Sequence, residues 1–66
     1  MMNIQQFMSM VVTHCRNKGY NLSTRNVIDV AIRDFPTSIN LHGFDNHDLY
    51  YQSRWYISKL RDGRLP

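Results

Sequence analysis

The sequence predicts a single compact all-α domain, spanning residues 1–66, with three helices at about residues 4–18, 24–35 and 46–62. Three observations predict this fold. Apolar residues recur at helical spacing in each segment, a side chain able to cap a helix precedes each, and each ends beside a proline or glycine. A chain of 66 residues has room for one domain only.

The first predicted helix, residues 4–18, has the clearest pattern. Asn3 precedes it as an N-cap, and Gly19 follows it as a natural terminator. Arg16 and Lys18 lie in its last turn, where cations complement the helix dipole. One face of this helix is apolar and is therefore predicted to be buried. Its residues are Ile4, Phe7, Met8, Val11, Val12 and Cys15.

The second predicted helix, residues 24–35, begins after Ser23, whose hydroxyl can accept a hydrogen bond from the first turn. Pro36 ends it, because the residue before a proline is driven away from helical backbone angles. The predicted buried stripe comprises Val27, Ile28, Ala31 and Phe35, with Val30 and Ile32 at its margins. The next residues are predicted to form a linker, in which the segment TSINL has the composition of a short strand.

The third predicted helix, residues 46–62, begins after Asp45 and ends at Gly63. At about 100° per residue, one face of this helix is suited to the core. That face carries Leu49, Ser53, Tyr56, Ile57 and Leu60. The remaining arc is aromatic and basic, and it includes Tyr51, Arg54, Trp55, Ser58, Lys59 and Arg61. For Trp55 two interpretations stay open: it is covered by another part of the domain, or it is offered to a partner.

The charge distribution favours an anionic partner. The chain has eight Lys and Arg residues against five acids, all of them aspartates, and its formal net charge is +3. Both ends of the chain carry a basic excess, whereas the middle is slightly acidic. A moderate basic excess favours binding to nucleic acid, although many domains without this function share it.

Two segments resemble helices of a known family. The strings LSTRNVIDVAIRDFP and SRWYISKLRDGRL are similar to the second and third helices of helix-turn-helix and winged-helix DNA-binding domains, over about residues 20–65. In that family the first helix braces the domain and the third lies in the major groove. The resemblance implies a non-enzymatic DNA-binding or transcription-regulatory module.

The sequence departs from this family at three points. The loop from Pro36 to Phe44 is longer than a tight turn, and the segment GRLP leaves the wing absent or rudimentary. Asp45 and Asp48 occupy the first turn of the third helix, where carboxylates would repel phosphate. The expected contacts therefore come from Tyr51, Arg54, Trp55, Ser58, Lys59 and Arg61, with Arg64, Arg16 and Lys18 on the phosphate backbone.

The same surface supports a second hypothesis from another class. Aromatic and arginine side chains are also enriched at the hot spots of protein interfaces. The alternative is a small adaptor or inhibitor that binds a host enzyme, and the compactness of the chain suggests a phage or bacterial source. Met2 and Met10 flank the core stripe of the first helix, which suggests a homodimer.

The residues argue against catalysis, against a metal site and against other cofactors. Cys15 is the only cysteine and lies on the core stripe, so it lacks a second thiol for zinc and the exposure of a nucleophile. His42 and His47 have the spacing of a zinc pair but are predicted to be ordinary surface histidines. The glycines are isolated, so no phosphate-binding loop is expected.

The same composition predicts a cytoplasmic protein without membrane contact. No apolar run approaches the roughly 18 residues that would span a bilayer. The first residues lack the basic segment and cleavage site of a signal peptide. A single cysteine also suits a reducing compartment.

Overall fold

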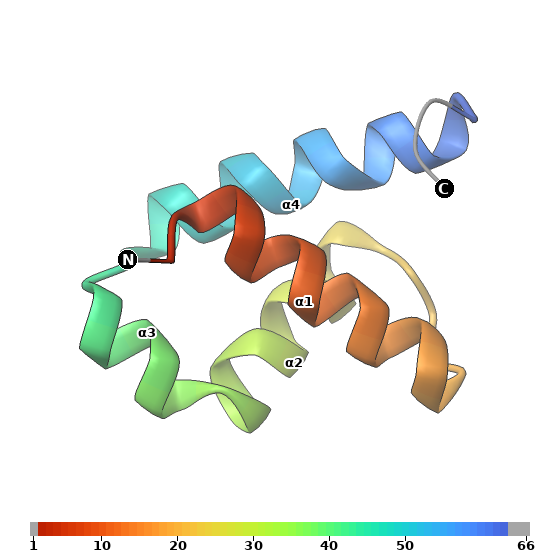
Figure 1. Ribbon diagram of the computed structural model, residues 1–66. Helices are drawn as coiled ribbons and strands as arrows, with labels where there is room; N and C mark the ends of the chain where they lie inside the picture. Colours follow the sequence, from red (N-terminus) through yellow and green to blue (C-terminus); the bar gives the residue numbers. More distant parts are fainter. Residues whose placement is uncertain (1, 64–66) are drawn as a thin grey trace.

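The computed structural model describes residues 2–63, and its regular elements over this range are four α-helices (Figure 1). They are α1 (Ile4–Lys18), α2 (Thr24–Asp34), α3 (Pro36–His42) and α4 (Asn46–Arg61). The predicted all-α class is confirmed. The prediction of three helices is wrong, because the segment expected to be a linker, TSINL included, forms α3.

The chemistry of proline explains the additional helix. Pro36 is the first residue of α3, a position that needs no amide hydrogen and that suits the fixed φ of proline. Phe35, with φ −130° and ψ 41°, is the one non-helical residue between α2 and α3. Gly43 ends α3 with a φ of +69°, a backbone conformation that glycine adopts without steric strain. Pro36 therefore ends one helix and also begins the next.

The predicted N-caps are confirmed. The side chain of Asn3 accepts a hydrogen bond from the amide of Gln6, and the side chain of Gln6 accepts one from the amide of Asn3. Ser23 caps α2 with its hydroxyl, and Asp45 caps α4 by accepting from the amide of Asp48 at 2.8 Å. Each cap of this kind is worth about 1 kcal/mol.

The core lies where α1, α2 and α4 meet. Figure 1 shows α1 and α4 beginning at the same end of the molecule. The buried apolar residues are Phe7, Met8, Val11, Val12, Cys15, Val27, Val30, Ala31, Leu49 and Ile57. The predicted stripe of α1 is thus buried except for half-buried Ile4. On α2 the prediction is corrected, because Val30 is buried whereas Ile28 is half-buried beside Tyr50.

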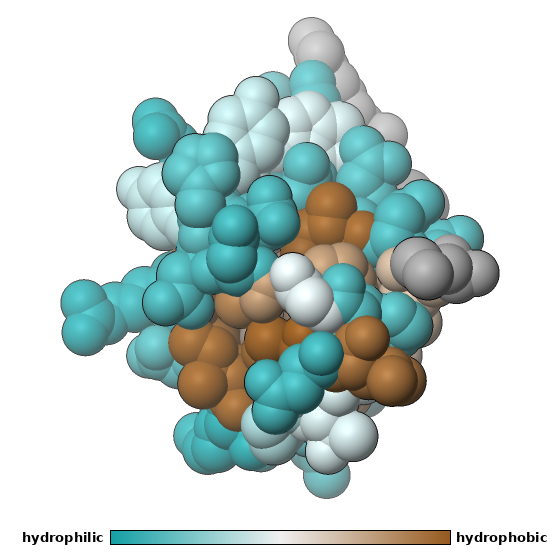
Figure 2. Space-filling model, turned by 90° about the vertical axis from the view of Figure 1, so that its left-hand side faces the viewer, coloured by the Kyte–Doolittle hydropathy of each residue, from teal (hydrophilic) through white to brown (hydrophobic). Residues whose placement is uncertain are grey.

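Aromatic contacts attach the residues on either side of α3 to α1. The ring of Phe7 lies 6.1 Å from that of Phe35, edge to face, and 5.0 Å from that of Phe44. These two partners flank α3 on either side in the chain, so α3 is held at both of its ends. Figure 2 looks onto this end of the molecule and shows apolar side chains at the centre of the face, with hydrophilic side chains around them. Within α3, Leu41 remains 76% exposed.

Two further predictions concern dimerisation and the membrane. Met2 and Met10 both pack against the core cluster. The observation that suggested a homodimer therefore no longer supports it, and dimerisation stays a prediction. Among residues 2–63, none of the helices combines the length and the apolar character that crossing a membrane would require.

Candidate binding surface on α4

The outer side of α4 carries an aromatic and basic groove of about 290 Å³. We call this feature the α4 surface. It is lined by Tyr50, Tyr51, Arg54, Trp55, Ser58 and Lys59. Five of these six residues, all except Tyr50, were predicted as contacts from the sequence. Arg61, a further predicted contact, is exposed in the last turn of the same helix.

Burial of the opposite face of α4 explains why this surface points outward. Leu49, Ser53 and Ile57 are buried against α1 and α2, as their spacing predicts. Tyr56 and Leu60 complete that face as half-buried residues packed on the core. The residues between these positions are left facing solvent, because a helix of this kind has only one stripe against the core.

The three rings of the α4 surface are exposed to different degrees. Tyr51 is 61% exposed, Tyr50 is 53% exposed and Trp55 is 39% exposed. Among residues 2–63, no part of the domain buries Trp55, so the first of its two interpretations is wrong; the second, contact with a partner, stays a prediction. Trp55 also lines a second shallow groove, on the α1 side, with Gln5, Gln6 and Ser9. Its ring meets Tyr56 edge-on at 6.2 Å.

Neighbours one helical turn away contact two of these rings. The Nζ atom of Lys59 lies 5.7 Å from the centre of the Trp55 ring, which is within the range of a cation–π interaction. The ring of Tyr51 is nearly parallel to that of His47, with the ring centres 6.4 Å apart and the planes 17° apart.

Tyr50 belongs to the α4 surface but was not among the predicted contacts. Its position is at the margin between the buried and solvent faces of α4, so the helical spacing alone assigns it to neither. In the structure it also lines a third groove, on the α2 side, with Thr24, Arg25 and Ile28. That Tyr50 lines this groove can be seen only when α2 is placed beside α4.

The remaining predicted contacts lie farther along the molecule. Arg16 and Lys18 are exposed in the last turn of α1. Figure 1 shows the C-terminal ends of α1 and α4 on the same side of the molecule. Two acidic residues lie at the opposite end of α4: Asp45 precedes the helix as its N-cap, and Asp48 lies in its first turn. The predicted contact Arg64 lies outside the described residues.

Comparison of the chain with protein-family models, with curated proteins and with solved structures found no match. Any function must therefore be argued from the chemistry of the residues themselves.

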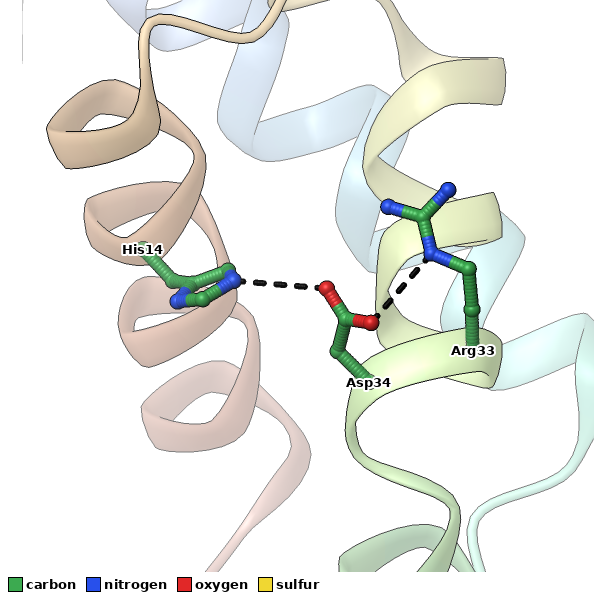
Figure 3. A network of polar contacts seen from close by, with 3 residues as sticks. All are labelled: His14, Arg33 and Asp34. Atoms are coloured by element: carbon green, nitrogen blue, oxygen red, sulfur yellow. Dashed lines mark hydrogen bonds and ion pairs between the residues drawn. The ribbon is translucent and has the colours of Figure 1, made fainter.

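A second polar cluster connects α1 to the end of α2 (Figure 3). The Nε2 atom of His14 lies 3.4 Å from Oδ2 of Asp34, and Nε of Arg33 donates to Oδ1 of the same carboxylate at 3.2 Å. The hydrogen bond from Arg33 is the main reason that the pKa of Asp34 lies below its usual value. Arg33 therefore pairs with its sequence neighbour. The cluster joins two helices and lines no groove with the rings of α4.

The cysteine and the other two histidines lie in separate surroundings. Cys15 is buried, and burial raises the pKa of its thiol, so the nucleophilic thiolate is disfavoured. His42 and His47 stack on different rings, those of Phe44 and Tyr51. His47 does approach Asp45 and Asp48 closely enough for a metal ion. All three are exposed, and the cap of α4 already accounts for the closeness of the two carboxylates.

Proposed function

We propose that the protein is a non-enzymatic nucleic-acid-binding or regulatory module that contacts its ligand through the α4 surface. One observation carries the proposal: the rings of Tyr50, Tyr51 and Trp55 and the cation of Arg54 lie around one groove on one face of a single helix. Cations neutralise phosphates and release their counterions, while aromatic faces stack on bases. DNA is the partner expected from the charge and from the sequence resemblance.

The exposure of these rings argues against a plain solvated face. Burying a large apolar side chain contributes about 1.5–3 kcal/mol, which a domain of this size needs for stability. Three aromatic side chains on α4 forgo part of that contribution, since each is at least 39% exposed. Exposed aromatic side chains gathered beside an arginine are enriched where proteins contact partners.

Arg54 is the cation that distinguishes binding from helix stabilisation. Lys59 and Arg61 lie in the last turn of α4, where a positive charge also complements the helix dipole. Arg54 lies in the middle of the helix, where the dipole gives no such reason. Its exposed position beside Trp55 in the groove is instead suited to a phosphate.

Titration of labelled duplex and single-stranded oligonucleotides at low salt tests the proposal. We expect binding that weakens steeply as salt is added, because counterion release drives it. Arg54→Ala combined with Arg61→Ala should lower the affinity markedly. Each of these substitutions should also lower the affinity by itself, and Arg33→Ala, which removes one charge from α2 beside Asp34, is the control for each of them. Absence of binding to every oligonucleotide at low salt would refute the proposal.

A protein-binding adaptor or inhibitor is the second candidate. The carboxylates of Asp45 and Asp48 at the start of α4 favour it, because they repel phosphate but suit a mixed protein interface. The aromatic rings and Arg54 would then form its hot spot. A pull-down after nuclease treatment separates the candidates: a partner retained without nucleic acid, and lost with Trp55→Ala, would favour this one.

A further inference from the structure

We infer that the ligand of the α4 surface is a single-stranded nucleic acid whose bases stack on Tyr50, Tyr51 and Trp55, and that α4 does not enter the major groove of a duplex. This inference rests on the proposed function and names the class of ligand. Four features of the described residues support it: the exposed rings, the acidic first turn, the succession of grooves across α4, and the cation beside Trp55.

The first feature is the nature of the exposed side chains. Bases in a duplex are stacked on one another, so their faces are covered and their edges are read through hydrogen bonds. Aromatic side chains stack on bases that are unpaired and splayed out. The side chains of Tyr50, Tyr51 and Trp55 are exposed around the α4 surface. One face of the Tyr51 ring lies toward His47, and Lys59 lies over one face of the Trp55 ring, so a base would stack on the opposite face of each ring or displace these neighbours. This surface is therefore better suited to unpaired bases than to base-pair edges.

The second feature is the charge of the first turn of α4. A recognition helix places its N-terminal residues against base edges, with phosphates on both sides. In α4 these positions hold Asp48 and the capping residue Asp45, and both are exposed. Their carboxylates would face the phosphates of a duplex groove. A strand that crosses α4 from Tyr50 to Lys59 leaves the first turn uncovered, and its end at Tyr50 is the part nearest to Asp48.

The third feature is a path across α4 formed by three grooves. Tyr50 lines both the α4 surface and the groove on the α2 side, whereas Trp55 lines both the α4 surface and the groove on the α1 side. Arg25, Arg54 and Lys59 are the cations along these grooves, and the carboxylate of Asp29 also lines the groove on the α2 side, beside Arg25. A flexible single strand can follow such a path over a curved surface, whereas a duplex resists bending and would have to be deformed at a cost in free energy.

The size of the domain limits the length of the bound strand. Its two shorter dimensions are 20 and 19 Å. At about 3.4 Å per nucleotide for stacked bases, this distance accommodates at most about six nucleotides. That length is within the range bound by other small single-strand-binding domains.

The fourth feature is the pairing of a cation with a ring. Lys59 places its ammonium group 5.7 Å from the centre of the Trp55 ring. A base stacked on Trp55 would bring its own phosphate close to Lys59. The ring would then contact the base, and the ammonium group would contact the phosphate. Prior contact with Lys59 also limits the freedom of the ring, which reduces the entropy lost on binding.

Trp55 itself provides the measurement, because it is the only tryptophan in the chain. Its fluorescence is followed while an octamer of deoxythymidine, an octamer of uridine or a DNA hairpin duplex of matched phosphate number is added at low salt. We expect quenching by the octamers and a dissociation constant at least about tenfold lower than for the duplex. Binding of either octamer in this manner supports the inference, and the comparison of the two shows whether DNA or RNA is preferred.

The outcomes separate the inference from the proposed function. Duplex binding as tight as octamer binding, or binding that leaves Trp55 fluorescence unchanged, overturns the single-strand inference and leaves the proposed function standing. Binding of neither octamers nor duplex overturns both.

Substitutions test stacking independently of fluorescence from the protein. With a dye-labelled octamer and anisotropy as the readout, Tyr51→Ala and Trp55→Ala should each raise the dissociation constant about tenfold. The salt slope should persist, because no cation is removed. Leu41→Ala, at an exposed apolar residue of α3, is the matched control and should bind normally. Circular dichroism verifies that each variant is folded, and unchanged binding by both ring variants overturns the inference.

Discussion

The hydroxyl of Tyr56 donates a hydrogen bond to Oγ of Ser9 at 3.1 Å, and this contact joins the middle of α4 to α1. Trp55, the next residue, meets the ring of Tyr56 edge-on with the ring centres 6.2 Å apart. A half-buried ring attached to α1 therefore supports the exposed ring of the α4 surface. The ring of Trp55, a candidate binding residue, is thus positioned by its contact with the ring of Tyr56, which is itself part of the fold.

Removing this hydroxyl should weaken the fold and leave the surface in place. Tyr56→Phe keeps the ring that supports Trp55 but loses the hydrogen bond to Ser9, so we expect a loss of about 0.5–1.5 kcal/mol in the free energy of unfolding. Urea titration measures this loss. Ser9→Ala should have a similar effect, and the double variant should be little worse than either one, because both remove the same bond. Fully additive losses would contradict the assignment.

Gly43, which ends α3, is a second residue whose contribution to the stability of the domain can be measured. Gly43 has a φ of +69°, and a Cβ atom added there would meet nothing within 4 Å. Gly43→Ala should therefore destabilise the domain by about 1 kcal/mol through backbone strain alone. Gly43→Asn should cost less, because asparagine tolerates the left-handed conformation better. Thermal unfolding followed by circular dichroism measures both, and equal stability of the alanine variant and the parent would contradict the prediction.

The helix bounds show how much local signals predict. The N-caps Asn3, Ser23 and Asp45 place the starts of α1, α2 and α4 at the predicted residues. α2 and α4 each end one residue earlier than predicted. These signals act within one turn, so they can be recognised without knowledge of the fold. α3 was missed because Pro36 was interpreted as a terminator alone, and seven residues are too few for a clear apolar period.

The candidate site was predictable where it depends on one helix and unpredictable where it depends on two. The spacing of α4 alone separates Arg54 and Tyr51 from the core face. Tyr50 and Trp55 required the neighbours of α4, since only the positions of α2 and α1 determine which margin of a helix is covered. The same reason explains why Val30 is buried in place of Ile28: the orientation of α2 depends on the two helices that it contacts.

The thiol of Cys15 should be unreactive in the folded protein. It is fully buried, and burial raises its pKa from an ordinary value of 9.0, so both access and ionisation oppose reaction. We expect a thiol reagent such as dithionitrobenzoate to react rapidly in concentrated urea and far more slowly in native buffer at the same pH. A native rate close to that of a free cysteine would show that α1 opens readily.

The carboxylate of Asp34 should make stability depend on acidic pH. Its pKa lies below the ordinary value of 3.8, first because Arg33 donates a hydrogen bond to it and also because His14 lies against it. A lowered folded-state pKa means that the group stabilises the fold above its unfolded-state pKa and loses this effect as the pH falls through the folded value. Asp34→Asn should therefore be less stable than the parent above about pH 4, and the difference should shrink at lower pH. Asp29→Asn is the matched control in α2, and a difference that stays constant down to about pH 2 would contradict the prediction.

Lys59 should affect both the environment of Trp55 and the electrostatics of binding. Lys59→Met retains most of the apolar stem but removes the charge that lies 5.7 Å from the Trp55 ring. An exposed cation–π contact is worth about 0.5–1 kcal/mol, so Trp55 emission should shift while the fold is little affected. With a labelled single-stranded octamer, the affinity should fall and the slope of log affinity against log salt should become shallower by about 0.7, because one phosphate contact is lost. Lys59→Arg keeps the charge and should keep the slope. A methionine variant with an unchanged slope would place the bound phosphates away from Trp55, and the path of the strand across α4 would then have to avoid this residue.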